Sequence, residues 1–178
     1  MSEKIKPWKE ISREIMFKKF GRGIEKVIFE LQDGSESDYY IKTEEGSIAV
    51  LALTSDNKVI LAKQFRPGPM KVLQELPGGG IEKGETLEQA GARELLEETG
   101  YAGDIKFVTR LIDCGYSRRR KNCLVATSCK KVAEQKLDST EFIEVNTVSI
   151  DEFKKILRSG QSTDIEIGYL GLDYLGLL

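Results

Sequence analysis

The feature that most constrains this chain is a run of glycines followed closely by a helix-forming segment. Pro77-Gly78-Gly79-Gly80 breaks any regular strand or helix, because proline lacks a backbone donor and glycine leaves the backbone unusually free. A helix is then predicted from about residue 86 to residue 98, since Thr86-Leu87-Glu88-Gln89 has the spacing of a capping box. Gly100 occupies the position of a C-terminal glycine cap. The fold must therefore accommodate a freely bending backbone segment just before a well-defined helix.

Glutamates gather on one side of this predicted helix. Glu94, Glu97 and Glu98 are three and four residues apart, so their side chains point in similar directions. The carboxylates repel one another near the unfavourable end of the helix dipole, at a cost of a few tenths to about 1 kcal/mol per pair. A solvated acidic face is the competing interpretation, but such a face usually intersperses Lys or Arg, and Arg93 is the only cation of the helix. The cluster therefore predicts a positively charged ligand.

The absence of histidine narrows the chemistry that this site can perform. Imidazole bases, Ser-His or Cys-His catalysis and histidine-ligated zinc are all excluded. The chain has 3 cysteines without CxxC spacing, which indicates neither a zinc site nor a disulfide framework. Oxygen ligands alone indicate a hard cation, and Mg²⁺ is the one that binds a few carboxylates together with substrate phosphate. The predicted cofactor is Mg²⁺, for which Mn²⁺ can substitute.

The charge balance argues against two classes of partner. The chain has 178 residues, with 27 Lys and Arg, 29 Asp and Glu and a formal net charge of −2, which favours neither nucleic acid nor an anionic membrane. Its apolar stretches are shorter than the roughly 20 residues of a membrane-spanning helix. The N-terminus also lacks the apolar segment of a secretory signal. We expect a cytoplasmic protein with one globular domain, or one domain with a small N-terminal elaboration.

Turn residues divide the rest of the chain into predicted strands. The first three look like a meander, and Ser55-Asp56-Asn57 joins two later strands as a hairpin. A final helix is predicted to begin at Thr163, with Glu166 completing a second capping box. The strands are predicted at residues 15–19, 25–31, 39–42, 47–53, 58–64, 72–76, 105–112, 122–129 and 143–148, and another helix at residues 151–157.

The sequence from Gly79 to Gly100 resembles the signature of the Nudix hydrolases. The spacing is glycine, five residues, glutamate, seven residues, then Arg-Glu-apolar-any-Glu-Glu-any-Gly-apolar, and every fixed position is present. Only Tyr101 departs, being aromatic where a small aliphatic residue is usual. The resemblance implies an α/β fold, namely a Nudix α/β/α sandwich around a mixed sheet with an added N-terminal antiparallel β-sheet. It divides the chain into N-terminal strands over residues 1–45, used for dimerisation, and a Nudix hydrolase domain over residues 46–178.

The resemblance also assigns roles within the signature. Glu85 matches the residue that salt-bridges and orients Arg93, so both are expected to support catalysis alongside Glu97. The glycines let the backbone approach metal and phosphate closely. The expected metal ligands are three carboxylates and one backbone carbonyl: Glu94, Glu97, Glu98 and Gly78.

The expected reaction is hydrolysis of a pyrophosphate bond by a metal-activated water. In many relatives the general base comes from a loop far downstream of the signature, and the acidic stretch Asp138-Ser139-Thr140-Glu141 occupies that place here. Glu141 is the first choice as the base and Glu144 the second. The alternative interpretation is an ordinary solvated loop acid.

Resemblance beyond the signature extends to the ADP-ribose and ADP-sugar pyrophosphatases, through the N-terminal meander and the stretches 62–68 and 74–79. It implies a homodimer with a shared substrate pocket and a nucleoside diphosphate sugar as the substrate. Arg66 then matches a phosphate or ribose contact, with a plain surface arginine as the alternative. Trp8 is expected to stack on adenine, although a lone tryptophan more often simply packs.

One stretch departs from this branch. A proline is usual about fifteen or sixteen residues beyond the signature, whereas this chain has Tyr116-Ser117 followed by Arg118-Arg119-Arg120-Lys121. The cations, beginning with Arg118, would either grip an extra phosphate or form a solvated turn. The substrate alternatives are therefore a GDP-sugar, a dinucleoside polyphosphate, coenzyme A or a nucleoside triphosphate. A nucleotide-sensing module without activity is a further alternative, but such modules typically lose the glutamates that this chain keeps.

Overall fold

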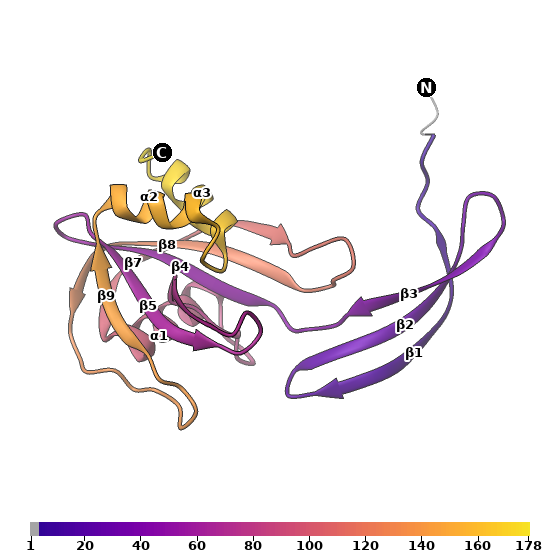
Figure 1. Cartoon of the computed structure of the whole chain (residues 1–178), viewed down its shortest axis with the longest axis horizontal. Coiled ribbons are helices and arrows are strands. Elements are labelled where there is room, and N and C mark those ends of the chain that lie inside the picture. The colour runs from indigo at the N-terminus through magenta and orange to yellow at the C-terminus, as the bar shows by residue number, and fades with distance from the viewer. Residues whose placement is uncertain (1–3) are drawn as a thin grey trace. The chain divides into compact units, whose positions relative to one another are not determined.

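The computed structural model describes residues 4–178 (Figure 1). By their internal contacts these residues form two compact units. The first contains the residues up to 46 together with 112–120, and the second contains residues 47–111 and 121–178. That residues 1–45 and 46–178 are separate domains remains a prediction.

The first unit is built on a three-stranded sheet. Strands β1 (Lys9–Lys19), β2 (Arg22–Glu30) and β3 (Glu36–Lys42) pair antiparallel in chain order. The predicted N-terminal antiparallel sheet is thus confirmed, although β1 begins well before residue 15. Segment 112–120 is held to β3, since the Lys42 N–H donates to the Tyr116 carbonyl and the Arg118 N–H donates to the Lys42 carbonyl, each at 2.9 Å.

The second unit is built on a six-stranded mixed sheet in the order β6-β5-β4-β8-β7, with β9 paired to β5. β4 and β8 run parallel, whereas β5 runs antiparallel to β4, β6 and β9. The predicted hairpin around Ser55-Asp56-Asn57 is the β4–β5 connection. The strands are β4 (Ser47–Thr54), β5 (Val59–Arg66), β6 (Lys71–Glu75), β7 (Tyr101–Ile112), β8 (Arg120–Lys131) and β9 (Glu144–Val148).

The glycine-rich segment runs along a central strand of this sheet. The Val50 N–H donates to the Pro77 carbonyl and the Ile48 N–H donates to the Gly79 carbonyl, both at 2.9 Å. A Cβ atom on Gly78 would lie 2.3 Å from the Ile48 carbonyl oxygen, so only glycine fits there. This pairing places the segment in the middle of the sheet, against β4.

Helices cover both faces of the six-stranded sheet, as Figure 1 shows. Alternate residues of β4 point to opposite faces, because side chains of a strand alternate. Val50 packs in the cluster that contains Leu95 of α1 (Leu87–Thr99). Leu51 packs instead with Phe153 of α2 (Ile150–Ser159) and Ile167 of α3 (Ile165–Tyr174). The predicted α/β/α sandwich around a mixed sheet is confirmed.

The ends of the helices show where local signals succeed and where they fail. Thr86 and Gln89 form the predicted capping box of α1, and Gly100 ends α1 with a φ of 74°. The second predicted box is wrong, because α3 begins at Ile165 without a side-chain cap. Thr163 Oγ1 instead donates to Glu75 at 2.7 Å, and Glu166 accepts from Lys121 at 2.6 Å. Both side chains therefore bind residues that are distant in the sequence and do not cap the helix.

Within residues 4–178, no helix is both long enough and apolar enough to span a bilayer.

Candidate active site

The glutamate cluster lies where α1 meets the glycine-rich segment. Glu98 is 5% exposed, and its carboxylate accepts a hydrogen bond from the Gly78 N–H at 2.9 Å. A Cβ atom on Gly79 would lie 2.3 Å from Oε1 of Glu94, so this glycine lets the backbone reach the second carboxylate. The structure therefore brings together the backbone and the helix that sequence analysis assigned to one site.

Arg93 is the cation of the cluster and lies between several oxygens. Its Nε donates to Glu85 at 2.8 Å, and its Nη2 donates to the Gly80 carbonyl at 2.9 Å. The expected Glu85–Arg93 pair is thus present. The same guanidinium also donates through Nη1 to Glu94 at 2.9 Å and to Glu97 at 3.3 Å, which sequence analysis did not anticipate.

Burial and neighbouring charges shift the pKa values of the carboxyl groups in the cluster. Burial raises the pKa of Glu98 to about 8, against the hydrogen bond from Gly78 and with the negative charges of Glu94 and Glu141 adding to it. Burial also raises the pKa of Glu94, which Arg93 partly offsets. The hydrogen bond from Arg93 lowers the pKa of Glu85. The site therefore gathers carboxyl groups where water is scarce, and burial there favours the protonated form of Glu94 and Glu98.

This donor set fits a hard divalent cation by its chemistry. All of its donors are oxygens, two of the carboxylates are largely buried, and their pKa values are raised by burial and by neighbouring negative charge. Across residues 4–178, no three acidic or cysteine side chains are already arranged to hold an ion. Arg93 donates to one oxygen each of Glu94 and Glu97, and Gly78 donates to one oxygen of Glu98, so each carboxylate keeps acceptor capacity for a metal.

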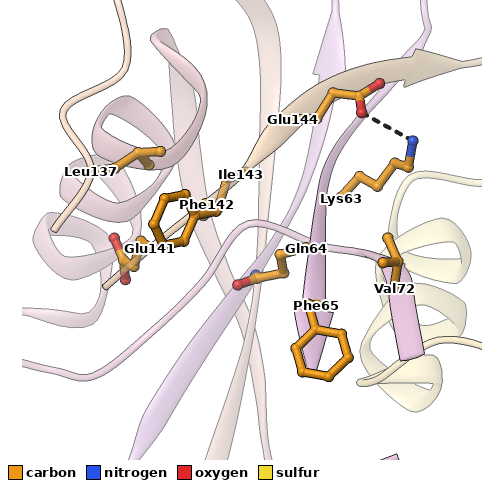
Figure 2. Close-up of a pocket in the computed structure, with 9 residues that line it drawn as sticks. All are labelled: Lys63, Gln64, Phe65, Val72, Leu137, Glu141, Phe142, Ile143 and Glu144. Atoms are coloured by element: carbon orange, nitrogen blue, oxygen red, sulfur yellow. Dashed lines mark hydrogen bonds and ion pairs between the residues drawn. The ribbon is translucent and has the colours of Figure 1, made fainter. Parts of the chain in front are cut away.

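Glu141 lies in the loop before β9 and lines a cavity of about 510 Å³, which Figure 2 shows. Its negative charge contributes to the raised pKa values of both Glu94 and Glu98. Glu144, the second choice as the base, instead accepts a 3.0 Å bond from Lys63. The cavity is lined by β5, β6, this loop and the start of β9: Lys63, Gln64, Phe65, Val72, Leu137, Glu141, Phe142, Ile143 and Glu144.

Arg66 lies at the end of β5 and has a buried partner. Its Nε donates to Glu75 at 2.7 Å, and Glu75 is only 1% exposed. Burial raises the pKa of Glu98, and the positive charge of Arg66 offsets a small part of that rise, so Arg66 acts electrostatically on the cluster. The role of Glu75 was not predicted from the sequence, because β6 also contains Lys71 and Gln74 and its pattern does not show that Glu75 is buried.

Trp8 and Arg118 belong to the first unit. Trp8 packs 5.3 Å from the ring of Tyr39, which in turn stacks on Tyr116 at 6.3 Å. Arg118 lies 3.3 Å from Glu25. A cavity of about 410 Å³ lies beside these rings and is lined by Trp8, Phe29, Tyr39, Ile41, Gly115 and Tyr116. The grouping of Phe29, Tyr39 and Tyr116 with Trp8 was not predicted from the sequence, because these residues come from separate segments and form no local motif.

The cationic run that begins at Arg118 is largely engaged in ion pairs. Arg119 lies 3.4 Å from Glu44. Lys121, in the second unit, lies 2.9 Å from Asp164 and 2.6 Å from Glu166. Arg118, Arg119 and Lys121, three of the four cations of the run, thus pair with carboxylates of the protein itself. These ion pairs do not favour the expectation that the run binds an extra phosphate.

Comparison with known proteins identifies the class. The NUDIX domain model matches residues 44–165, and the chain belongs to the Nudix family. It is a Nudix pyrophosphohydrolase, an enzyme class that generally needs a divalent metal. The fold agrees with the crystal structure of an ADP compounds hydrolase, which is 18% identical with a TM-score of 0.81 and covers 99% of this chain and 100% of that one.

Curated relatives match along most of the chain. An ADP-ribose pyrophosphatase of Bacillus subtilis (strain 168) is 33% identical over 95% of this chain and 92% of its own length. An ADP-ribose pyrophosphatase of Saccharomyces cerevisiae is 30% identical over 82% of this chain and 73% of its own length. A methanol dehydrogenase activator of Bacillus methanolicus is 32% identical over 80% of this chain and 81% of its own length.

Proposed function

We propose that this enzyme hydrolyses the pyrophosphate bond of a nucleoside diphosphate joined to a sugar, with ADP-ribose or an ADP-sugar as the substrate. The products are a nucleoside monophosphate and a sugar phosphate. The observation that carries the proposal is the position of the Glu94 and Glu98 carboxyl groups against the glycine-rich segment, a set of oxygen donors suited to a metal that binds pyrophosphate. The names of the relatives support the choice of ADP-ribose.

The cofactor is proposed to be Mg²⁺, with Mn²⁺ able to substitute. Bound by the four proposed ligands, it would neutralise charge on the pyrophosphate and lower the pKa of an attacking water. Arg93 keeps its contacts with Glu85 and Gly80 and so fixes the backbone near the reacting phosphates. The four proposed ligands are the side chains of Glu94, Glu97 and Glu98 and the carbonyl of Gly78.

Glu141 is proposed to take the proton of the attacking water. Its carboxylate lines a cavity and acts electrostatically on Glu94 and Glu98, as a base beside the metal ligands should. Arg66 is proposed to donate to a phosphate oxygen, since Nε is held by Glu75 and the remaining guanidinium donors can face substrate.

The aromatic cavity of the first unit is proposed to bind adenine. Trp8, Tyr39 and Tyr116 offer flat faces, and a stacked ring adds roughly 0.5–1.5 kcal/mol beyond the area that it buries. Arg118 is proposed to contact substrate at the edge of this unit, in competition with Glu25. The N-terminal sheet is proposed to form a homodimer.

The variant Trp8→Ala tests the proposed adenine site. It should raise KM for ADP-ribose at unchanged kcat, and an unchanged KM would show that Trp8 does not bind the substrate.

A substrate panel tests the proposed function. ADP-ribose, ADP-glucose, GDP-mannose, a dinucleoside polyphosphate, coenzyme A and a nucleoside triphosphate are each incubated with the enzyme and Mg²⁺, and the products are separated by chromatography. We expect AMP and ribose 5-phosphate from ADP-ribose at the highest kcat/KM. If only the nucleoside triphosphate lost pyrophosphate, the proposed substrate class would be wrong.

A further inference from the structure

The segment between β8 and β9 is attached to the C-terminal end of α1. The N–H groups of Val132 and Ala133 donate to the Gly100 carbonyl at 2.9 and 3.2 Å. The Lys136 N–H donates to the Glu97 carbonyl at 2.9 Å. These bonds satisfy carbonyls that a helix end leaves without an intrahelical partner. The segment thus begins in a fixed place beside the glutamate cluster.

Gln135 makes a second attachment through its side chain. Its Nε2 donates to the Glu98 carbonyl at 2.7 Å and to the Ile143 carbonyl at 3.0 Å. An amide nitrogen has two N–H groups, and this one uses both on backbone oxygens. Ile143 is buried, with 8% exposure. One side chain therefore joins the end of α1 to the residue at which the chain returns to β9.

The loop between these two anchors carries Glu141. The loop holds its own shape through reciprocal bonds, since the Glu141 N–H donates to the Asp138 carbonyl and the Asp138 N–H donates to the Glu141 carboxylate, each at 3.0 Å. Neither bond ties the loop to α1. The position of the loop relative to α1 therefore depends on its two ends, and Gln135 connects both.

We propose that Gln135 is a positioning residue that fixes the loop of Glu141 relative to the glutamates of α1. This inference rests on the proposed function, in which Glu141 is the base and α1 carries the metal ligands. Removing the amide leaves the Glu98 and Ile143 carbonyls without this donor. The return end of the loop then loses its direct link to α1 and is held by the burial of Ile143 and by the pairing of Glu144 with Lys63. Misplacing a reacting group by about 1 Å can reduce the rate about 100-fold.

The test compares side chains of similar length at position 135. Gln135→Met keeps the length but removes both donors, and we expect kcat for ADP-ribose to fall about 10- to 100-fold with KM little changed. Gln135→Lys restores donors, and a cation at a helix C-terminus is favourable, so this variant should recover most of kcat. Gln161→Met removes an exposed glutamine amide of the same unit and should behave as wild type.

Hydrogen exchange supplies a readout that does not depend on activity. Amide exchange of residues 138–142 should accelerate in Gln135→Met, while exchange in α1 stays near that of wild type and the variant stays folded at the assay temperature despite a lower melting temperature. Gln161→Met should leave the loop unchanged. Wild-type exchange together with wild-type kcat in Gln135→Met would overturn the proposal. A loss of kcat that only mirrors a loss of folded protein would overturn it as well, because that result describes a structural residue.

The experiments distinguish a failure of the proposed function from a failure of the proposed role of Gln135. If the wild-type enzyme cleaved no nucleoside diphosphate sugar, the proposed function would fail, and exchange in the loop would still decide whether Gln135 holds it. If the wild type were active and Glu97→Gln inactive while Gln135→Met kept full kcat, the proposed function would stand and the role of Gln135 would fall.

Discussion

The backbone N–H of Gly78 donates to the carboxylate of Glu98 at 2.9 Å, and this bond joins the glycine-rich segment to α1. It is formed in a place that water hardly reaches, since Glu98 is 5% exposed. A buried carboxylate with a single backbone donor is costly for stability, because most of its hydration is lost. The buried Glu98 carboxylate therefore lowers the stability of the fold, as groups in functional sites often do.

Glu98→Gln is predicted to stabilise the metal-free protein at pH 8. Folding raises the pKa of Glu98 from its ordinary value of 4.5 to about 8, so between these pH values the folded state binds a proton that the unfolded chain releases. Stability contributed by this group is therefore present below pH 4.5 and is lost as the pH rises to 8. Glutamine still accepts from Gly78 but carries no charge.

Urea unfolding with a chelator present checks this prediction. At pH 8 the variant should exceed wild type by roughly 1–3 kcal/mol, and the difference should shrink toward pH 5. Hydrolysis should be lost in the same variant. A variant that is less stable than wild type at both pH values would contradict the interpretation of Glu98 as a strained carboxylate.

Gly79→Ala is predicted to damage activity more than stability. The new Cβ would lie 2.3 Å from Oε1 of Glu94, and this carboxylate is the end of a flexible side chain that can turn away. Turning misplaces a proposed metal ligand, so kcat/KM should fall roughly 10- to 100-fold. Gly68→Ala is the control, because its Cβ would meet nothing within 4 Å. Equal activity in the two variants, measured at saturating Mg²⁺, would disprove the prediction.

Thr163→Val is predicted to destabilise the fold. Thr163 Oγ1 donates at 2.7 Å to Glu75, which is 1% exposed, and valine removes this donor. The loss should cost about 1–3 kcal/mol in the free energy of unfolding. Thr147→Val, on the exposed part of β9, should change it by less than about 0.5 kcal/mol. Similar values for both variants would show that the Thr163–Glu75 bond contributes little.

The sequence predicted best where the signal was local. The capping box of Thr86 and Gln89, the glycine cap at Gly100 and the Glu85–Arg93 pair all depend on residues close together in the chain, and each is present. The layers of the second unit were expected from the resemblance to the Nudix family and not from the apolar pattern, since β4 is buried on both faces and shows no alternation.

The sequence failed where a distant partner decided the outcome. Thr163 and Glu166 have the spacing of a cap, but Glu75 and Lys121 bind them instead. The contacts of Gln135 and the packing of Tyr116 on Tyr39 also join residues far apart in the chain. No local pattern encodes such contacts, since they exist only once the sheets have formed.

The most direct test of the central claim is Mg²⁺-dependent hydrolysis of ADP-ribose by wild type and Glu97→Gln. Glu97 is partly exposed, with its side chain at 35%, so glutamine should leave the fold intact. We predict that wild type releases AMP and ribose 5-phosphate only when Mg²⁺ or Mn²⁺ is present. Glu97→Gln should lose at least about 100-fold in kcat, the scale of removing a preorganised electrostatic contact. Equal rates in the two proteins, or full activity with a chelator, would contradict the account.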